Sequence, residues 1–340
     1  MSQTHELTFG GEICAYLEAH GWLVSQNDAG YDRELALFPE DVFAWLEATQ
    51  PEQLAKKVKP SMSEGERAKA RTKLLRALAD DLNAPDPQGG SLQVLRTGFK
   101  NTPATFTMME KRPEKTSNAK VNARYAANRL RVMREVRYST KNENRIDLVL
   151  FVNGIPVATV ELKTDFNQSV EHAKRQYRDD RPPAGEPLLT FGARALVHFA
   201  VSNDEVWMTT RLAGKHTRFL PFNRGDDGHA GNGPDEDGGC PTTYLWRDVW
   251  ARDQWLDILG KFIHYETDKT TDPKTGKQSV SKALIFPRYH QLDAVTKIVA
   301  DARELGAGQK YLIQHSAGSG KTRSIAWTAH RLATLHDAND

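Results

Sequence analysis

The clearest hydrophobic pattern in the chain is a pair of apolar runs, residues 146–152 and 155–162, which flank Asn153-Gly154. Both runs are rich in β-branched residues, which favour strands. Asn-Gly is a dipeptide typical of tight hairpin turns, because both of its residues tolerate a positive φ. The pattern therefore predicts two buried antiparallel strands joined by a short turn.

Charged residues interrupt this pattern near the outer ends of the hairpin, at Asp147, Glu161 and Lys163. Glu161 and Lys163 share a face because side chains two residues apart on a strand point the same way. With a regular two-residue turn, Asp147 would point to the opposite face from Glu161. We therefore predict either a turn with an odd number of residues or a β-bulge, since only these bring the two carboxylates together.

These three residues are candidates for metal-assisted hydrolysis of a phosphodiester. Asp147 and Glu161 would hold Mg²⁺, which polarises the phosphate and activates a bound water. Lys163 would orient that water or stabilise the charge that develops on the phosphate. An Asp followed at a distance by Glu-x-Lys also occurs by chance on surface hairpins, but the buried character of these strands favours the catalytic interpretation.

The spacing of apolar residues predicts the other elements of the chain. Helices are expected over residues 6–22, within 40–82, and over 122–128, 170–177, 246–258, 289–305 and 323–335. Strands are expected over residues 130–138, 195–201, 205–209 and 310–315, with one or two short strands within 91–107. The Gly- and Asp-rich residues 223–243 are expected to form a loop, because their spacing does not match a calcium-binding EF-hand.

A second motif follows the strand expected at residues 310–315 and precedes the helix expected at 323–335. It consists of Gly318, Ser319, Gly320, Lys321 and Thr322. The glycines allow a tight path that turns backbone amides toward a polyphosphate, the lysine can reach the terminal phosphates, and the threonine hydroxyl can bind Mg²⁺. A chance Gly-Ser-Gly-Lys-Thr turn is the alternative, but the expected strand–turn–helix context favours ATP binding.

Composition narrows the possible classes. The chain has 340 residues, 39% hydrophobic and 26% charged, with a net charge of +2, as is usual for a globular protein with room for two domains. Its two cysteines, Cys14 and Cys240, cannot form a disulfide framework or a four-cysteine zinc site. No apolar run is long enough to span a membrane and no signal peptide is evident, so a cytoplasmic location is expected.

Basic residues are concentrated just before the hairpin. Residues 111–145 contain eleven Lys and Arg against three Glu. Such a stretch can contact the phosphates of DNA, or it can be a solvated face. The candidate phosphodiesterase site beside it favours double-stranded DNA.

The order of these motifs resembles the N-terminal part of the R subunit of type I restriction endonucleases, over essentially the whole chain. The resemblance is carried by Glu12 with Gly21-Trp22, Asp147 with Glu161-Leu162-Lys163 (the PD-(D/E)xK nuclease pattern), Gln176-Tyr177, Leu220–Asn223, Arg288–Gln291 and His315–Thr322. It implies an α/β fold with a restriction-endonuclease-like mixed sheet flanked by helices, followed by the first strand–loop–helix unit of a RecA-like helicase domain. The implied domains are a nuclease domain at residues 1–264, a linker at 265–281 and the beginning of the helicase at 282–340.

The resemblance also implies an activity. It implies Mg²⁺-dependent cleavage of double-stranded DNA coupled to ATP-driven translocation, in a complex with modification (methyltransferase) and specificity subunits. Gln291 would read the adenine edge of ATP, and His315 stands where many phosphate loops have glycine, as in superfamily-two helicases. Many relatives carry Gln four residues before Tyr behind the nuclease motif; here Ala173 precedes Tyr177 by four, so the resemblance assigns no role to Gln176 or Tyr177. Glu12 is compatible with a place near the metal or with a solvated helix position.

Two other hypotheses stay open. One is a different nuclease–helicase fusion of phage defence, such as a type III-like or single-chain restriction enzyme. The other is a non-catalytic docking domain in front of a helicase motor, in which the three charged residues are structural. The sequence stops at Asp340, before the further ATPase motifs of a helicase, so we expect a fragment or part of a longer protein that does not hydrolyse ATP alone.

Overall fold

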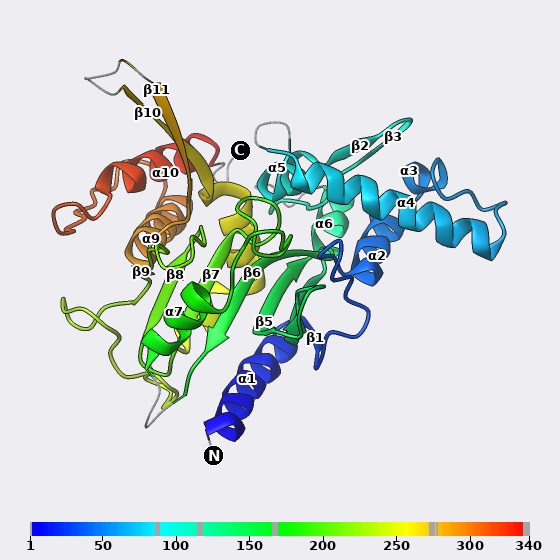
Figure 1. Cartoon of the computed structure of the whole chain (residues 1–340). Helices are drawn as coiled ribbons and strands as arrows, with labels where there is room; N and C mark the ends of the chain where they lie inside the picture. The colour runs from blue at the N-terminus through cyan, green and yellow to red at the C-terminus, as the bar shows by residue number, and fades with distance from the viewer. Residues whose placement is uncertain are drawn as a thin grey trace.

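The computed structural model describes residues 2–85, 89–113, 118–164, 169–271, 276 and 278–335, with side chains from residue 8 onward. In this part of the chain, seven strands form a mixed sheet in the order β1-β4-β5-β6-β7-β8-β9 (Figure 1). The strands are β1 (Leu23–Ser25), β4 (Leu130–Arg137), β5 (Arg145–Val152), β6 (Ile155–Leu162), β7 (Val197–Val201), β8 (Val206–Thr209) and β9 (Leu220–Pro221). The pairs β1–β4 and β6–β7 are parallel, and the others are antiparallel. The expected mixed α/β sheet is confirmed.

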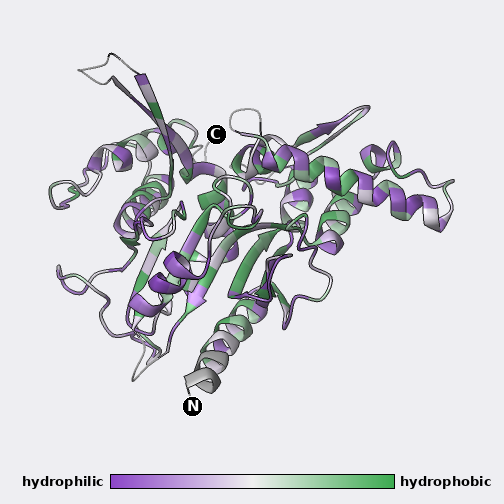
Figure 2. Cartoon of the chain, viewed as in Figure 1, coloured by the Kyte–Doolittle hydropathy of each residue, from purple (hydrophilic) through white to green (hydrophobic). Residues whose placement is uncertain are grey.

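Helices cover both faces of this sheet. On one face, α1 (Ser2–Ala19) contacts β1, β4 and β6. On the other face, α7 (Val170–Asp179) lies over β6, β7 and β8 (Figure 1). Apolar side chains fill the space between these layers, so the central strands are strongly hydrophobic and the outward faces of the helices are polar (Figure 2).

A helical region lies beside the β1–β4–β5 side of the sheet (Figure 1). It contains α2 (Pro39–Thr49), α3 (Pro51–Ala55), α4 (Glu64–Asn83), α5 (Ser91–Thr97), α6 (Ala119–Ala126) and the small ribbon of β2 (Phe99–Asn101) and β3 (Ala104–Phe106). One or two short strands were expected within residues 91–107, and two are present, but α5 in front of them was not expected. In α4, which lies mostly within the helical range predicted at residues 40–82, Leu74, Leu75, Leu78 and Leu82 form the buried face.

The turn between β5 and β6 is a two-residue turn in which both residues have a positive φ, 49° at Asn153 and 80° at Gly154. Gly154 is required here for a second reason. A Cβ atom at this position would lie 2.5 Å from the carbonyl oxygen of Phe38 and 2.7 Å from the backbone nitrogen of Val42. The amide of Phe38 also donates to the Gly154 carbonyl oxygen at 2.8 Å, so the turn packs directly against the start of α2.

The predicted β-bulge is present. Val152 pairs with Ile155 and Phe151 with Pro156, but Leu150 pairs with Ala158, so Val157 is the extra residue. Beyond the bulge, Val149 pairs with Thr159 and Leu148 with Val160. This shift of one residue turns Asp147 and Glu161 toward the same face of the sheet, the face that α7 covers.

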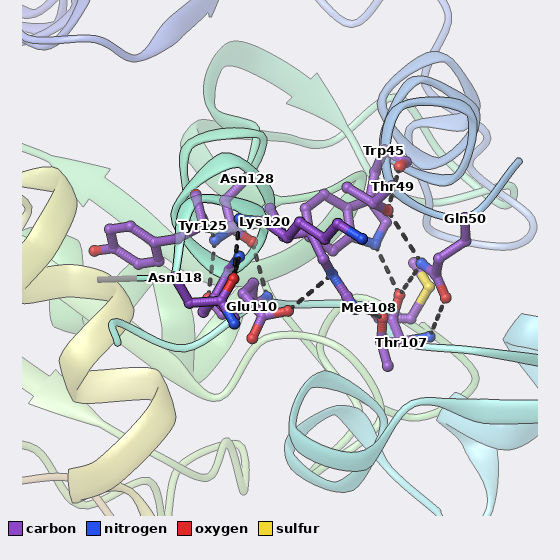
Figure 3. A network of polar contacts seen from close by, with 12 residues as sticks. Trp45, Thr49, Gln50, Thr107, Met108, Glu110, Asn118, Lys120, Tyr125 and Asn128 are labelled. Atoms are coloured by element: carbon purple, nitrogen blue, oxygen red, sulfur yellow. Dashed lines mark hydrogen bonds and ion pairs between the residues drawn. The ribbon is translucent and has the colours of Figure 1, made fainter. Parts of the chain in front are cut away.

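Polar contacts hold the turn from its other side. The side-chain nitrogen Nδ2 of Asn153 donates to the carbonyl oxygen of Met108 at 2.9 Å and to Asn128 Oδ1 at 3.0 Å. Asn128 in turn exchanges hydrogen bonds with the backbone of Glu110. Figure 3 shows this network continuing through Thr107 to Gln50 of the α2–α3 junction. The hairpin is thereby fixed to the helical region.

The carboxyl-terminal part of the described chain begins after a broken helical segment. The single helix predicted at residues 246–258 is wrong. These Trp-rich residues lie in three short segments, a π-helical turn η1 (Leu245–Val249), α8 (Arg252–Asp257) and a second π-helical turn η2 (Ile258–Phe262). The break lets Trp250 and Trp255 both be fully buried. Of the polar stretch expected as a linker, residues 265–271 and 278–281 lie in a two-stranded ribbon, β10 (His264–Thr271) and β11 (Gln278–Ile285), which projects from the body (Figure 1).

Two helices follow the ribbon, α9 (Tyr289–Leu305) and α10 (Lys321–Ala333), close to the predicted ranges. The prediction of a strand at residues 310–315 is wrong, because these residues form no strand in the structure. A strand needs a neighbour for its backbone hydrogen bonds. The described residues provide none here, and Leu312 is 93% exposed.

Helix α10 is attached to the ribbon and to η2. Arg323 donates to both carboxylate oxygens of Glu266, at 2.8 and 2.6 Å, and the Trp327 ring nitrogen donates to the carbonyl oxygen of Phe262 at 2.9 Å. Within the described residues, no helix is both long and apolar enough to cross a membrane.

The close packing of the turn leads to a stability prediction. We expect Gly154→Ala to lower the free energy of unfolding by about 2–4 kcal/mol, because it adds a steric clash to the cost of a positive φ. Gly21→Ala is the matched control, since Gly21 has a φ of 87° but no atom within 4 Å of the added Cβ. It should cost only about 1 kcal/mol. Equal losses in urea unfolding of the two variants would contradict this account of the turn.

Candidate active site

A cavity of about 510 Å³ opens at the end of the hairpin that lies away from the turn. Asp147 from β5 and Lys163 from the end of β6 lie on its wall. Glu161 lies beside them on β6 and is completely buried. The structure therefore brings the three predicted residues together at one place.

Asp147 is oriented by the neighbouring strand. Its Oδ2 atom accepts a hydrogen bond from the backbone nitrogen of Leu162 at 2.7 Å. Lys163 is held from the other side of β6, because its backbone nitrogen donates to the Val201 carbonyl oxygen of β7 at 2.8 Å. Lys163 is 9% exposed.

Glu161 is a buried carboxyl group with one satisfied oxygen. Its Oε1 atom accepts from Arg181 Nε at 2.8 Å, and its Oε2 atom has no hydrogen-bond partner among the described residues. Burial raises the pKa of Glu161 well above its ordinary value, and the negative charge of Asp147 raises it further; Arg181 and Lys163 act in the opposite direction. A cation placed between the carboxylates would remove this penalty.

The residues present fit a magnesium ion. No group of three or more His, Cys, Asp or Glu side chains with metal-binding geometry occurs in the described part of the chain. Mg²⁺ does not need such a group, because it usually keeps several waters and binds through one or two carboxylates together with substrate phosphates. The unpartnered Oε2 of Glu161 is the atom that a metal would satisfy.

Arg181 was missed by the sequence reasoning. It lies in the charged, proline-containing loop after α7, where an arginine is usually solvated. In the structure it is only 5% exposed and reaches across both hairpin strands. Only the fold shows this contact, since nothing in the spacing of the loop residues points to Glu161.

The other candidates occupy different surroundings. Gln176 lines the same cavity as Asp147. Tyr177 does not, because it is fully buried and its hydroxyl group is hydrogen-bonded to Thr159 Oγ1 at 2.8 Å. Glu12 is exposed and lines a second cavity of about 370 Å³ together with Thr164.

The second motif forms a compact loop at the start of α10. Gly318 and Gly320 have φ values of 72° and 84°, as the sequence predicted for a tightly turned loop. The ammonium group of Lys321 donates to the carbonyl oxygens of His315 and Ser316 at 2.9 and 3.1 Å, so it lies over the loop. Thr322 is exposed on the first turn of α10.

The side chain of Gln291 is hydrogen-bonded to the backbone of this loop. Its side-chain nitrogen donates to the carbonyl oxygens of Ser319 and Gly320, at 3.2 and 3.0 Å, while its oxygen accepts from the Arg288 amide at 2.9 Å. Gln291 is 2% exposed. The structure therefore brings Gln291 to the phosphate loop, in contact with its backbone.

Comparison with known proteins fits this geometry. Residues 12–217 match the family described as "Type I restriction enzyme R protein N terminus". The chain belongs to this family. A relative from Methanocaldococcus jannaschii, named "Putative type I restriction enzyme MjaVIIIP endonuclease subunit", is 25% identical over 202 residues, which are 55% of this chain and 17% of the relative.

The part of this R-protein sequence that matches the family contains Asp147, Glu161, Lys163 and Arg181, and it ends before the phosphate loop. The family match therefore bears on the hairpin site and the sheet around it. It leaves the loop at Gly318–Thr322 to be judged by its own geometry.

A chain of buried polar groups lies behind the hairpin site. Thr159 Oγ1 is 2.8 Å from the Tyr177 hydroxyl and 2.7 Å from His198 Nδ1. Burial lowers the pKa of His198 to about 3. His198 is thus neutral in the folded protein and accepts through Nδ1 when Tyr177 donates to Thr159 and Thr159 donates to His198.

This neutral histidine predicts a pH dependence of stability. Between the ordinary pKa of 6.5 and the folded value of about 3, the unfolded chain binds a proton at His198 that the folded chain does not. The contribution of His198 to the free energy of unfolding therefore falls as the pH falls through this window, by up to about 1.4 kcal/mol per pH unit. Urea unfolding at pH 7, 6, 5 and 4.5 should show a shallower pH slope for His198→Asn than for the unmodified protein.

The exposed His216 provides a control. His216→Asn should keep the slope of the unmodified protein. Parallel pH profiles for His198→Asn and the unmodified protein would show that His198 is not the buried neutral group described above.

Proposed function

We propose that this chain carries the DNA-cleaving centre of a type I restriction enzyme, and that the centre hydrolyses phosphodiester bonds of double-stranded DNA with Mg²⁺. The observation that supports this most is the bulge at Val157, which turns two carboxylates to one face at the edge of a cavity. The family match supports the same assignment.

Each residue has a role that follows from its place. Asp147 and Glu161 would hold the metal, and the Oε2 atom of Glu161, which has no partner among the described residues, would be available as a ligand. The bound ion supplies a Lewis acid for the phosphate and a water of lowered pKa. Lys163, on the cavity wall, places a positive charge beside the phosphate oxygens, where charge increases in the transition state.

Fewer basic residues of the stretch at 111–145 are proposed to contact DNA than the sequence suggested. Arg129 and Arg131 pair with the buried Asp41, and Arg137 pairs with Asp28, so these arginines hold the fold together. Arg134 lines the cavity, and Arg145 on the same wall pairs with Glu135 at 3.7 Å. We propose that Arg134 contacts the DNA backbone next to the cleavage site.

We further propose that residues 1–264 form the nuclease domain, 265–281 the connection, and 282–340 the beginning of an ATP-driven DNA translocase. The glycine conformations at Gly318 and Gly320 and the place of Lys321 over the loop support ATP binding. Gln291, whose side-chain nitrogen is bonded to the carbonyl oxygens of Ser319 and Gly320, is proposed to contact adenine after releasing them. Modification and specificity subunits are the proposed partners, as the family of R proteins implies.

Cleavage by the full-length protein that contains this chain tests the nuclease. We expect Asp147→Ala, Glu161→Gln and Lys163→Ala each to lower the rate of DNA cleavage in Mg²⁺ and ATP by at least about 100-fold. The first two changes remove a proposed metal ligand, and the third removes the positive charge beside the phosphate. ATP turnover should stay unchanged. The control is Glu143→Ala, since Glu143 lines the same cavity but its side chain is 70% exposed. Cleavage that persists in Asp147→Ala and Lys163→Ala would overturn the assignment.

The phosphate loop is tested separately in the same full-length protein. We expect Lys321→Ala to abolish DNA-stimulated ATP hydrolysis, because the lysine charge no longer meets the terminal phosphates. The affinity of the hairpin site for Mn²⁺, measured by calorimetry, should not change. Unaltered ATP hydrolysis would exclude this loop as the nucleotide site.

A further inference from the structure

One buried guanidinium group connects the two strands that carry the carboxylates. Arg181 donates through Nε to Glu161 Oε1 at 2.8 Å and through Nη2 to the carbonyl oxygen of Arg145 at 2.6 Å. Arg145 is the first residue of β5 and precedes Asp147 by two positions. A third, longer contact joins Nη1 to the Asp180 carbonyl oxygen at 3.4 Å.

These contacts lie where the regular pairing of the hairpin gives way to side-chain contacts. The paired register of β5 and β6 runs from the turn to Leu148 and Val160. Beyond this last pair, the backbone nitrogen of Leu162 donates to the side chain of Asp147. The strand ends that carry Asp147 and Glu161 are therefore joined by side chains.

We propose that Arg181 is a positioning residue for the metal site, an inference that rests on the proposed function. It fixes the Oε1 atom of Glu161 and leaves Oε2 buried and without a partner among the described residues, available to the metal. Through the Arg145 carbonyl oxygen it also holds β5 at a set distance from β6. Arg181 thus keeps the two carboxylates in the arrangement that a divalent cation needs.

If only the charge of Arg181 mattered, removing this residue would be expected to strengthen metal binding, not to weaken it. A guanidinium group beside a metal site repels the cation, so its removal would tighten metal binding if Coulomb repulsion were the dominant effect. If orientation of Glu161 dominates, the same removal weakens metal binding. The direction of the change therefore separates a positioning role from a purely electrostatic one.

The experiment is a calorimetric titration of Mn²⁺ into the 340-residue chain, without DNA. We expect Arg181→Met and Arg181→Lys each to weaken Mn²⁺ binding by about 10-fold or more, as is typical when a group that orients a metal ligand is lost. Arg181→Lys keeps the charge but cannot span both strands. Arg145→Met is the matched control, because it removes a guanidinium from the same cavity wall and leaves the Arg145 carbonyl oxygen in place. It should bind Mn²⁺ as tightly as the unmodified chain or more tightly.

Mn²⁺ binding by Arg181→Met that equals or exceeds that of the unmodified chain would overturn the inference. If Arg181→Met does not fold, as judged by circular dichroism, Arg181→Lys decides by the same criterion. The variant Asp147→Ala distinguishes failure of the role proposed for Arg181 from failure of the proposed metal site. Loss of Mn²⁺ binding in Asp147→Ala with unchanged binding in Arg181→Met rejects only the role of Arg181, whereas unchanged binding in Asp147→Ala rejects the metal site and the proposed function with it.

Discussion

The site depends on the register of one hairpin, which is set by the turn at Asn153-Gly154 and the bulge at Val157. Side chains alternate along a strand, so one additional residue decides whether Asp147 and Glu161 share a face. The turn cannot shift to absorb this residue, because Gly154 touches α2 and Asn153 is bonded to the segment around Met108. The extra residue must therefore lie between the turn and the carboxylates, where the structure has it.

The same arrangement places unfavourable charge in the interior. Glu161 is fully buried, its Oε2 atom has no partner among the described residues, and Asp147 is close enough to raise its pKa. An isolated buried carboxylate is destabilising by several kcal/mol, so a site of this kind persists only where the rest of the fold compensates. The compensation comes from apolar packing on both faces of the sheet and from the contact with Arg181. Local stability is thus lowered at the place where a cation would restore it.

The sequence predicted what depends on local pattern. The hairpin strands, α7, α9 and the necessity of a bulge all follow from the alternation or helical spacing of apolar residues, and the structure has each of them. Arg181 was beyond this reasoning because its contact with Glu161 depends on how a loop folds back over the sheet. The strand expected at residues 310–315 failed for a related reason. Its apolar residues suit a strand, but strand formation is decided by a neighbour that the local sequence does not specify.

Strand β7 connects the two candidate sites physically. Its Val201 carbonyl oxygen holds the backbone of Lys163, and the ring of Phe199 contacts Phe286, just before α9. From there, Gln291 reaches the phosphate loop. Every link in this path is a buried side chain or a hydrogen bond to the backbone. Packing of this kind sets the distance between two sites, whereas transmission of a signal requires an element with two arrangements whose equilibrium both sites bias. We therefore interpret β7 as a spacer between the two candidate sites.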